Sequence, residues 1–144
     1  MSKEIILKKL EQIKELLGEL ERLLTSPITD FKNNLTAIRA AERNFELAVE
    51  LSSDINTQIL FELGKKTPDS YRESFSSLSK AGVIEDKLAE KLMQSARLRN
   101  ILVHEYDFEE DYEKFYRSAK EYIPVFREYT ETIYKYKTEE NLSQ

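Results

Sequence analysis

Apolar residues return every three or four positions through most of this chain, which is the spacing of a helix with one buried face. The clearest stripe comes first and consists of Ile6, Leu10, Ile13, Leu17, Leu20 and Leu24. Only three Gly and three Pro interrupt the 144 residues, and a sheet protein would need more turn residues. The sequence therefore predicts an all-α fold, and its length fits one domain with a substantial core.

Turn residues divide the chain into about five expected helices, which span residues 2–24, 30–63, 71–81, 84–106 and 108–137. Gly64 and Gly82 are expected to cap the second and third helices. Ser70 and Glu73 match a capping box, in which each side chain can bond the other residue's backbone N–H. The second helix is long for a globular protein, so a break within it is an alternative. In the last helix, a kink is expected at Pro124.

Short connections between these helices favour an antiparallel bundle. We expect residues 1–144 to form a single domain, with residues 138–144 as a frayed tail and Asp107 with Glu110 as a second capping box. The aromatic residues of the last helix are expected in the core or at a dimer seam: Tyr112, Phe115, Tyr116, Tyr122, Phe126 and Tyr129.

Composition excludes several classes of protein. The chain has no cysteine, which rules out disulfides and thiolate zinc sites. No apolar run approaches the roughly 20 residues of a membrane span, and the charged N-terminal segment predicts an amphipathic helix, not a signal peptide. We expect a cytoplasmic protein without a membrane partner. The net charge of −5 argues against a protein that coats nucleic acid, but it allows a local basic cleft.

The sole histidine, His104, lies in the segment RLRNILVHEYD at residues 97–107. A lone histidine in an apolar run is more often a packed, hydrogen-bonded residue than a catalyst. The nearby Arg99 favours a catalytic role for His104. Its forked guanidinium suits phosphate oxygens, and His104 can exchange a proton near neutral pH. The two side chains supply the charge stabilisation and the proton transfer that phosphodiester cleavage needs.

Helical geometry constrains how Arg99 and His104 can act together. Five positions separate them, which corresponds to about 140° around an ideal helix, so they do not share a face. Asn100 and His104 do share one, with Arg97 a further turn along. A joint site needs Arg99 and His104 to flank a groove, or a helix that loosens near His104, or a second subunit. We favour a twofold dimer, because one histidine cannot be general acid and general base at once.

The pattern R-x-x-x-x-H-x-Y, formed by Arg99, His104 and Tyr106 with Asn100 after the arginine, resembles the signature of the HEPN superfamily. It is most similar to the HepT-like toxins of HEPN/MNT toxin–antitoxin modules, and the surrounding sequence resembles them from about residue 35 onward. This resemblance implies a homodimeric, metal-independent endoribonuclease of a type VII-like system, with the motif in the dimer cleft and no cofactor. The 2′-hydroxyl of the RNA would attack the phosphorus, with His104 as general acid or base, Arg99 on the phosphoryl oxygens and Asn100 orienting the motif.

The same resemblance implies a control point at Tyr106. In HepT-like systems an MNT-type nucleotidyltransferase antitoxin transfers AMP onto the tyrosine of this motif. Added AMP would place negative charge and bulk at the mouth of an RNA site and repel the RNA backbone. Without the resemblance, Tyr106 is an ordinary aromatic residue at a helix end.

Basic residues on the approach to the motif are candidates for contact with RNA, namely Lys87, Lys91 and Arg97. Their simpler interpretation is a solvated helix face. The main alternative for the whole chain is a catalytically inactive helical module that binds a nucleotidyltransferase and keeps the motif for packing.

Overall fold

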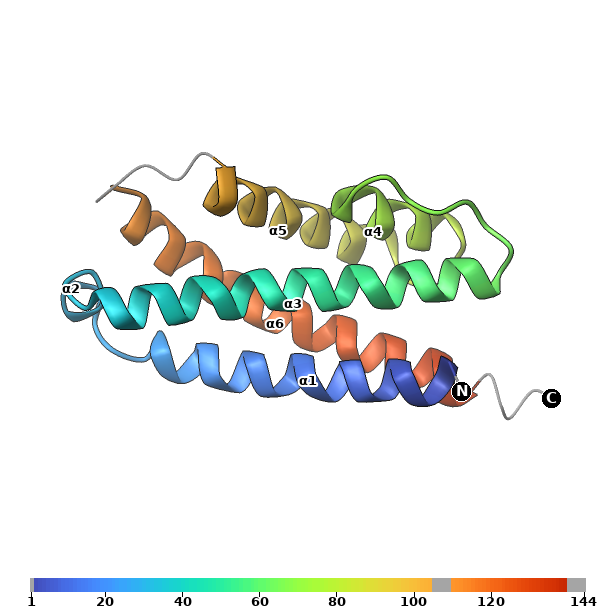
Figure 1. Ribbon diagram of the computed structural model, residues 1–144, viewed down its shortest axis with the longest axis horizontal. Helices are drawn as coiled ribbons and strands as arrows, with labels where there is room; N and C mark the ends of the chain where they lie inside the picture. Colours follow the sequence, from blue (N-terminus) through green and yellow to red (C-terminus); the bar gives the residue numbers. More distant parts are fainter. Residues whose placement is uncertain (1, 105–109, 140–144) are drawn as a thin grey trace.

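The computed structural model describes residues 2–104 and 110–139 of the chain. Within these ranges it has six helices and no strand: α1 (Ser2–Leu23), α2 (Ile28–Phe31), α3 (Leu35–Glu62), α4 (Tyr71–Lys80), α5 (Asp86–His104) and α6 (Glu110–Glu139). The four long helices α1, α3, α5 and α6 alternate in direction, and α4 lies beside α5 (Figure 1). The predicted all-α antiparallel bundle is confirmed, with one more helix than expected.

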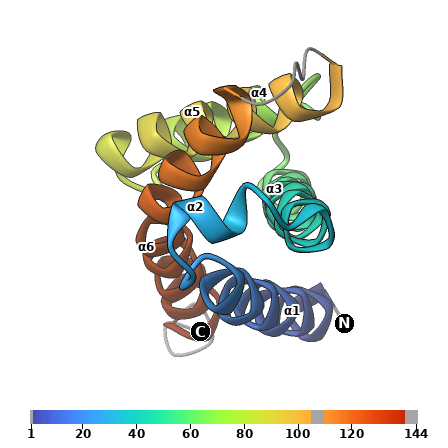
Figure 2. The same ribbon diagram turned by 90° about the vertical axis from the view of Figure 1, so that its left-hand side faces the viewer.

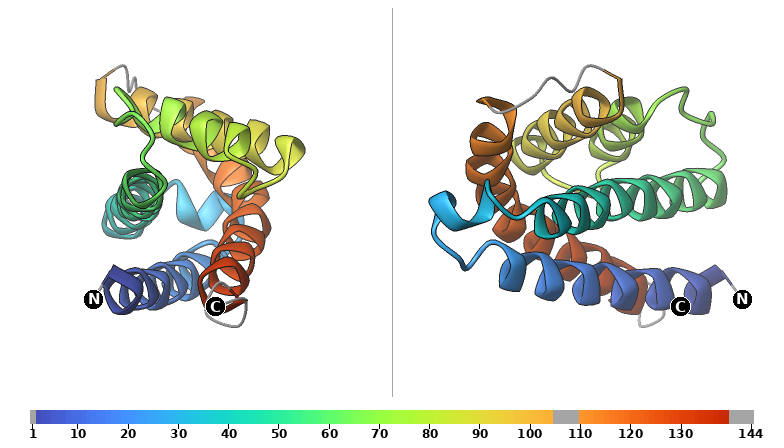
Figure 3. Two further views of the ribbon diagram at one scale, coloured as in Figure 1. Left: turned by 90° about the vertical axis from the view of Figure 1, so that its right-hand side faces the viewer. Right: turned by 60° about the vertical axis from the view of Figure 1, so that its left-hand side comes forward.

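The long helix α6 connects the two sides of the bundle. It begins at the level of α5 and ends beside α1, while α3 lies between α1 and the α4–α5 pair (Figures 2 and 3). Every residue of the stripe expected in α1 is buried, with no more than 3% of its surface exposed. Phe115, Phe126 and Tyr129 of α6 are buried as well. None of the described helices is both long and apolar enough to cross a membrane.

The expected second helix, residues 30–63, is interrupted near its start. The short helix α2 ends at Phe31, and α3 begins only at Leu35. Asn34 has an extended backbone, with φ −118° and ψ 90°, and its side-chain oxygen accepts a hydrogen bond from the Ala37 N–H at 3.1 Å. Asparagine breaks the helix here because its side chain offers the backbone an alternative hydrogen bond and a better N-cap.

Two C-terminal glycine caps and one N-terminal capping box were also predicted, and only the two glycine caps have the expected form. Gly64 and Gly82 adopt positive φ values of 70° and 80° directly after α3 and α4, as expected for C-terminal caps. Ser70 accepts from the Glu73 N–H at 3.0 Å, but the Glu73 carboxylate accepts from the Asp69 N–H, not from Ser70. One of the two capping-box hydrogen bonds is therefore shifted by one residue, because Glu73 binds the N–H of Asp69 instead of that of Ser70.

The predictions for the last helix differ from the structure at one end. Helix α6 continues through Pro124 and reaches Glu139, so the predicted tail was wrong for residues 138 and 139, which are helical. Residues 140–144 and the capping box at Asp107 lie outside the described residues.

A buried chain of hydrogen bonds joins α6, α3 and α4. The Tyr129 hydroxyl lies 2.6 Å from Asn56 Oδ1, and the Asn56 amide donates to Ser74 Oγ at 3.0 Å. The Ser74 hydroxyl donates to the Tyr71 carbonyl at 2.7 Å. Burial raises the pKa of Tyr129 well above its usual range, so this hydroxyl keeps its proton and donates. The chain therefore fixes the start of α4 to the core of the bundle.

Removal of the Tyr129 hydroxyl should destabilise the fold measurably. Tyr129→Phe leaves the buried Asn56 amide oxygen without its donor, which costs about 1–3 kcal/mol of unfolding free energy. Urea unfolding followed by circular dichroism measures the change. The matched control Tyr134→Phe, at a side chain that is 52% exposed, should stay within about 0.5 kcal/mol of the wild type. Equal stability of the Tyr129 and Tyr134 variants would contradict the structural role of the network.

Candidate functional site

The predicted motif lies on the second half of α5, which remains helical through His104. The structure describes the side chains of Arg99 and Asn100. The side chain of His104 and the whole of Tyr106 lie outside the described residues. The juxtaposition of Arg99 with His104, and the place of Tyr106 at the rim of the site, therefore remain predictions.

Arg99 continues the buried stripe of α5, after Leu88, Leu92 and Ser95. Its side chain is only 17% exposed, and Nη2 lies 3.8 Å from Oε1 of Glu50 on α3. Nη1 donates to the Asn100 side-chain oxygen at 3.4 Å, and the guanidinium carbon lies 4.7 Å from the ring centroid of Tyr71. An ion pair and a cation–π contact thus hold this arginine from two sides.

The carboxylate that holds Arg99 belongs to an acidic row on α3. Glu42, Glu46 and Glu50 recur every four residues and therefore lie along one side of the helix. Arg43 lies 3.8 Å from Glu46 and 3.6 Å from Glu50. Burial raises the pKa of Glu46 above its ordinary value, Arg43 and Arg99 oppose this rise, and Glu50 adds to it. Arg39 and Arg43 of α3 pair with this row of three carboxylates, and Arg99 of α5 supplies a third positive charge through Glu50.

Three buried polar atoms of Arg99 and the acidic row lack a hydrogen bond within the described part of the chain. They are Arg99 Nε, Glu50 Oε2 and Glu42 Oε2. Buried donors without an acceptor are rare in folded proteins, and functional sites are among the places where they occur. The guanidinium of Arg99 therefore has donor capacity that Glu50 and Asn100 do not use.

A polar groove runs past Arg99 between α3, the loop before α4 and α5. Its volume is about 420 Å³, and it is lined by Ser53, Asp54, Thr57, Pro68, Asp69, Ser70, Tyr71, Arg99 and Asn100. Arginine and amide donors on one wall suit an anionic group. The carboxylates of Asp54 and Asp69 would repel such a group, so it has to bind on the arginine side of the groove. Among the side chains that the structure describes, at residues 3–100 and 112–139, no group of three or more acidic side chains is placed to hold a metal ion.

The residues predicted for RNA approach do not gather at this groove. Lys87, Lys91 and Arg97 are all exposed on α5, but none of them lines the groove beside Arg99. Arg97 and Arg99 are two positions apart, so they point in nearly opposite directions from the helix. Arg97 instead lines a second cavity with Arg72 of α4.

Glu50 and Tyr71 were missed by the sequence analysis. Glu50 is 49 positions from Arg99, and no spacing rule connects residues so far apart. The available signal was weak: a row of acidic residues at helical spacing on a helix that is otherwise largely buried. Tyr71 was visible only as the first residue of an expected helix.

An all-α bundle that carries an arginine motif on α5 matches a known protein family. The family described as Ribonuclease HepT-like matches residues 6–133. The chain therefore belongs to the HepT-like ribonuclease family, as its motif predicted, and the predicted class of enzyme, an endoribonuclease, is confirmed.

Two curated relatives and one solved structure show how broad the similarity is. A tRNA nuclease HepT from Aphanizomenon flos-aquae is 34% identical over 105 residues, which are 72% of this chain and 70% of that protein. A putative RNase from Archaeoglobus fulgidus is 31% identical over 107 residues, 74% of each chain. A tri-AMPylated HEPN toxin from Shewanella oneidensis, solved in complex with its MNT antitoxin, has a TM-score of 0.79 and 25% identity, and the match covers 90% of this chain and 96% of that one.

Proposed function

We propose that this chain is a metal-independent endoribonuclease toxin of a type VII-like toxin–antitoxin pair, acting in the cytoplasm as a homodimer of one domain, residues 1–144. The observation that carries the proposal is Arg99, held by Glu50 and Tyr71 at the wall of a polar groove with an unused buried donor, five positions before the only histidine. The solved complex of a HEPN toxin with an MNT antitoxin supports the assignment of a nucleotidyltransferase partner.

The proposed reaction is an internal phosphoryl transfer. The 2′-oxygen of the RNA attacks the adjacent phosphorus while one His104 accepts the 2′-hydroxyl proton. The bond to the 5′-oxygen breaks, and the His104 of a second subunit donates a proton to this leaving group. Arg99 stabilises the negative charge that accumulates on the phosphoryl oxygens. The products are a 2′,3′-cyclic phosphate and a 5′-hydroxyl end.

Asn100 has a positioning role in this proposal. Its side-chain oxygen accepts from Arg99 Nη1 at 3.4 Å, while Glu50 and Tyr71 hold the other sides of the guanidinium. Together these contacts limit the rotamers of Arg99 before RNA binds. A preorganised donor stabilises a transition state better than a mobile one, because little reorganisation is needed when the charge develops.

Control by the partner is proposed to act at Tyr106. AMP transferred to this tyrosine adds negative charge beside a site that binds RNA, which is itself a polyanion. It also adds bulk to a residue that is only two positions after His104. The tri-AMPylated state of the Shewanella oneidensis toxin supports modification as the mode of inhibition. The alternative function, an inactive module that binds a nucleotidyltransferase, predicts association with the antitoxin but no RNA cleavage.

RNA cleavage in excess EDTA tests the proposed function against this alternative. The purified protein should cut a labelled single-stranded RNA, and the fragments should carry 2′,3′-cyclic phosphate and 5′-hydroxyl ends, which mass spectrometry identifies. A substrate with 2′-deoxyribose throughout should remain intact, because it lacks the nucleophile. His104→Ala prepared in the same way controls for contaminating nucleases. Absence of cleavage by folded, dimeric protein would support the inactive binding module instead.

A further inference from the structure

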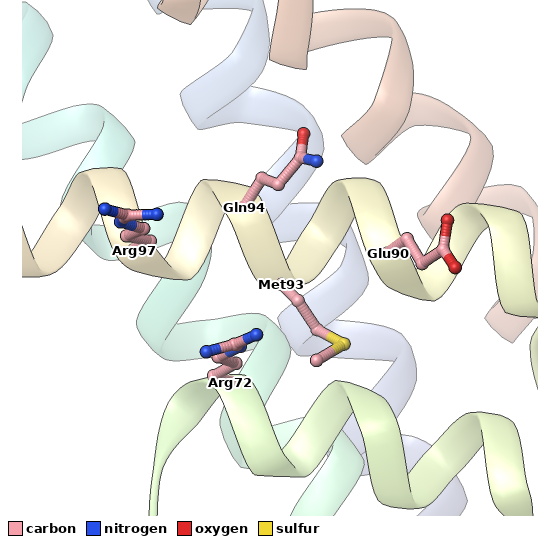
Figure 4. A pocket seen from close by; sticks show the side chains of 5 residues that line it. All are labelled: Arg72, Glu90, Met93, Gln94 and Arg97. Atoms are coloured by element: carbon pink, nitrogen blue, oxygen red, sulfur yellow. The ribbon is translucent and has the colours of Figure 1, made fainter.

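A second cavity lies between α4 and α5, on a different side of α5 from Arg99. Its volume is about 290 Å³, and it is lined by Arg72, Glu90, Met93, Gln94 and Arg97 (Figure 4). Pockets for small molecules span roughly 300–1,000 Å³. This cavity is at the lower end of that range, so it has room for a single small chemical group. Met93 extends towards α4 and supplies the apolar part of the wall (Figure 4).

The charge of this cavity is separated along α5. The guanidinium groups of Arg72 and Arg97 lie at one end, and the Glu90 carboxylate lies at the other (Figure 4). Seven positions, about 10 Å of helix, separate Arg97 from Glu90. Among the side chains that the structure describes, at residues 3–100 and 112–139, neither arginine makes an ion pair, and nor does Arg22, whereas Arg39, Arg43, Arg99, Arg117 and Arg127 each pair with a glutamate. Two neighbouring guanidinium groups with no carboxylate paired to either of them are arranged to share an anion.

The cavity also has a defined position relative to the motif. Arg97 precedes Asn100 by three positions and His104 by seven, so these positions share one side of the helix. Seven residues span about 10 Å, roughly the length of three stacked nucleotides at ~3.4 Å each. An RNA strand that reaches His104 can therefore reach Arg97 without leaving α5.

We propose that this cavity binds one nucleotide of the single-stranded RNA substrate, at a distance of a few nucleotides from the cleaved bond. This inference rests on the proposed ribonuclease function. The phosphate lies between Arg72 and Arg97, and the base packs against Met93. Gln94 can bond the edge of the base, and the Glu90 carboxylate can accept from a base amino group but repels phosphate, which fixes the orientation of the nucleotide. Unstacked bases read in this way are typical of single-stranded RNA recognition.

Binding of a non-cleavable RNA to the full chain tests the subsite. A fluorescein-labelled 12-nucleotide 2′-O-methyl RNA lacks the nucleophile, so its Kd can be measured by anisotropy with the active protein over a series of salt concentrations. The double variant Arg72→Gln, Arg97→Gln should bind at least ~10-fold more weakly, and the slope of log K against log salt should shrink by about 0.7 for the lost phosphate contact. On cleavable RNA, KM should rise while kcat stays within about threefold.

Arg22→Gln is the matched control, because it removes an exposed arginine from α1, which lies across the bundle from α5. If the control and the double variant weaken binding equally, the effect is general electrostatics and the subsite is wrong, although the ribonuclease function stands. If the double variant is monomeric where the wild type is dimeric by light scattering, the arginines hold subunits together and the subsite is overturned. If the wild type neither binds nor cleaves RNA, the proposed function fails, and the subsite fails with it.

Discussion

Arg99→Ala should lower kcat for RNA cleavage by about 100- to 1,000-fold, the usual effect of removing one preorganised donor from a developing oxyanion. KM should change much less, because the lost contact is strongest in the transition state. Single-turnover cleavage of a labelled RNA, with protein in excess, measures the chemical step directly. The control variant Arg22→Ala, which removes an exposed arginine from α1, should leave kcat within about twofold.

Arg99→Lys should not restore the rate. The lysine ammonium keeps the positive charge, but it cannot reproduce the flat contact with the Tyr71 ring at 4.7 Å while it also bonds Glu50 and Asn100. The two substitutions therefore separate charge from geometry. Recovery of more than a tenth of the wild-type kcat by lysine would show that a point charge is sufficient and that the clamp around Arg99 has no catalytic role.

Tyr106→Phe should abolish modification by the antitoxin while cleavage persists. Incubation of the wild type with ATP and the nucleotidyltransferase should add one or more adenylyl groups, visible by intact-mass spectrometry, and should reduce RNA cleavage at least ~10-fold through repulsion of the RNA backbone. Phenylalanine lacks the acceptor oxygen, so neither change should occur.

Tyr134→Phe is the matched control for this experiment, since Tyr134 is an exposed tyrosine of α6. It should be modified and inhibited like the wild type. A mass shift that persists in Tyr106→Phe would assign the modification to another residue, and peptide mapping would then locate it.

The helical architecture was predictable because each long helix carries its own apolar stripe. All six core positions expected along residues 2–24 are buried, and such local patterns need no knowledge of the partner helix. The break at Asn34 was not placed, because it depends on one side chain that competes with the helix for the Ala37 N–H. Local hydrogen-bond competition of this kind is decided by small energy differences that periodicity does not measure.

The site was predictable only as far as its motif. The spacing of Arg99 and His104 predicted the family, and their different helical faces led to the proposal of a composite cleft. The contacts of Arg99 with Glu50 and Tyr71 depend on how α3, α4 and α5 pack together, which no local spacing encodes. Arg97 was grouped with the approach to Arg99 by proximity in sequence, although two residues of helix place it on another side.

The buried hydrogen bonds from Tyr129 to the Tyr71 carbonyl have a genetic consequence for a toxin. Tyr71 supports Arg99 with its ring and is held by Ser74 and Asn56 through its backbone. A selection for cells that survive the toxin would therefore collect inactivating substitutions at Asn56 and Ser74, which are fully buried, as well as in the motif. The positions of these substitutions would show how far from the motif a buried change can still inactivate the protein.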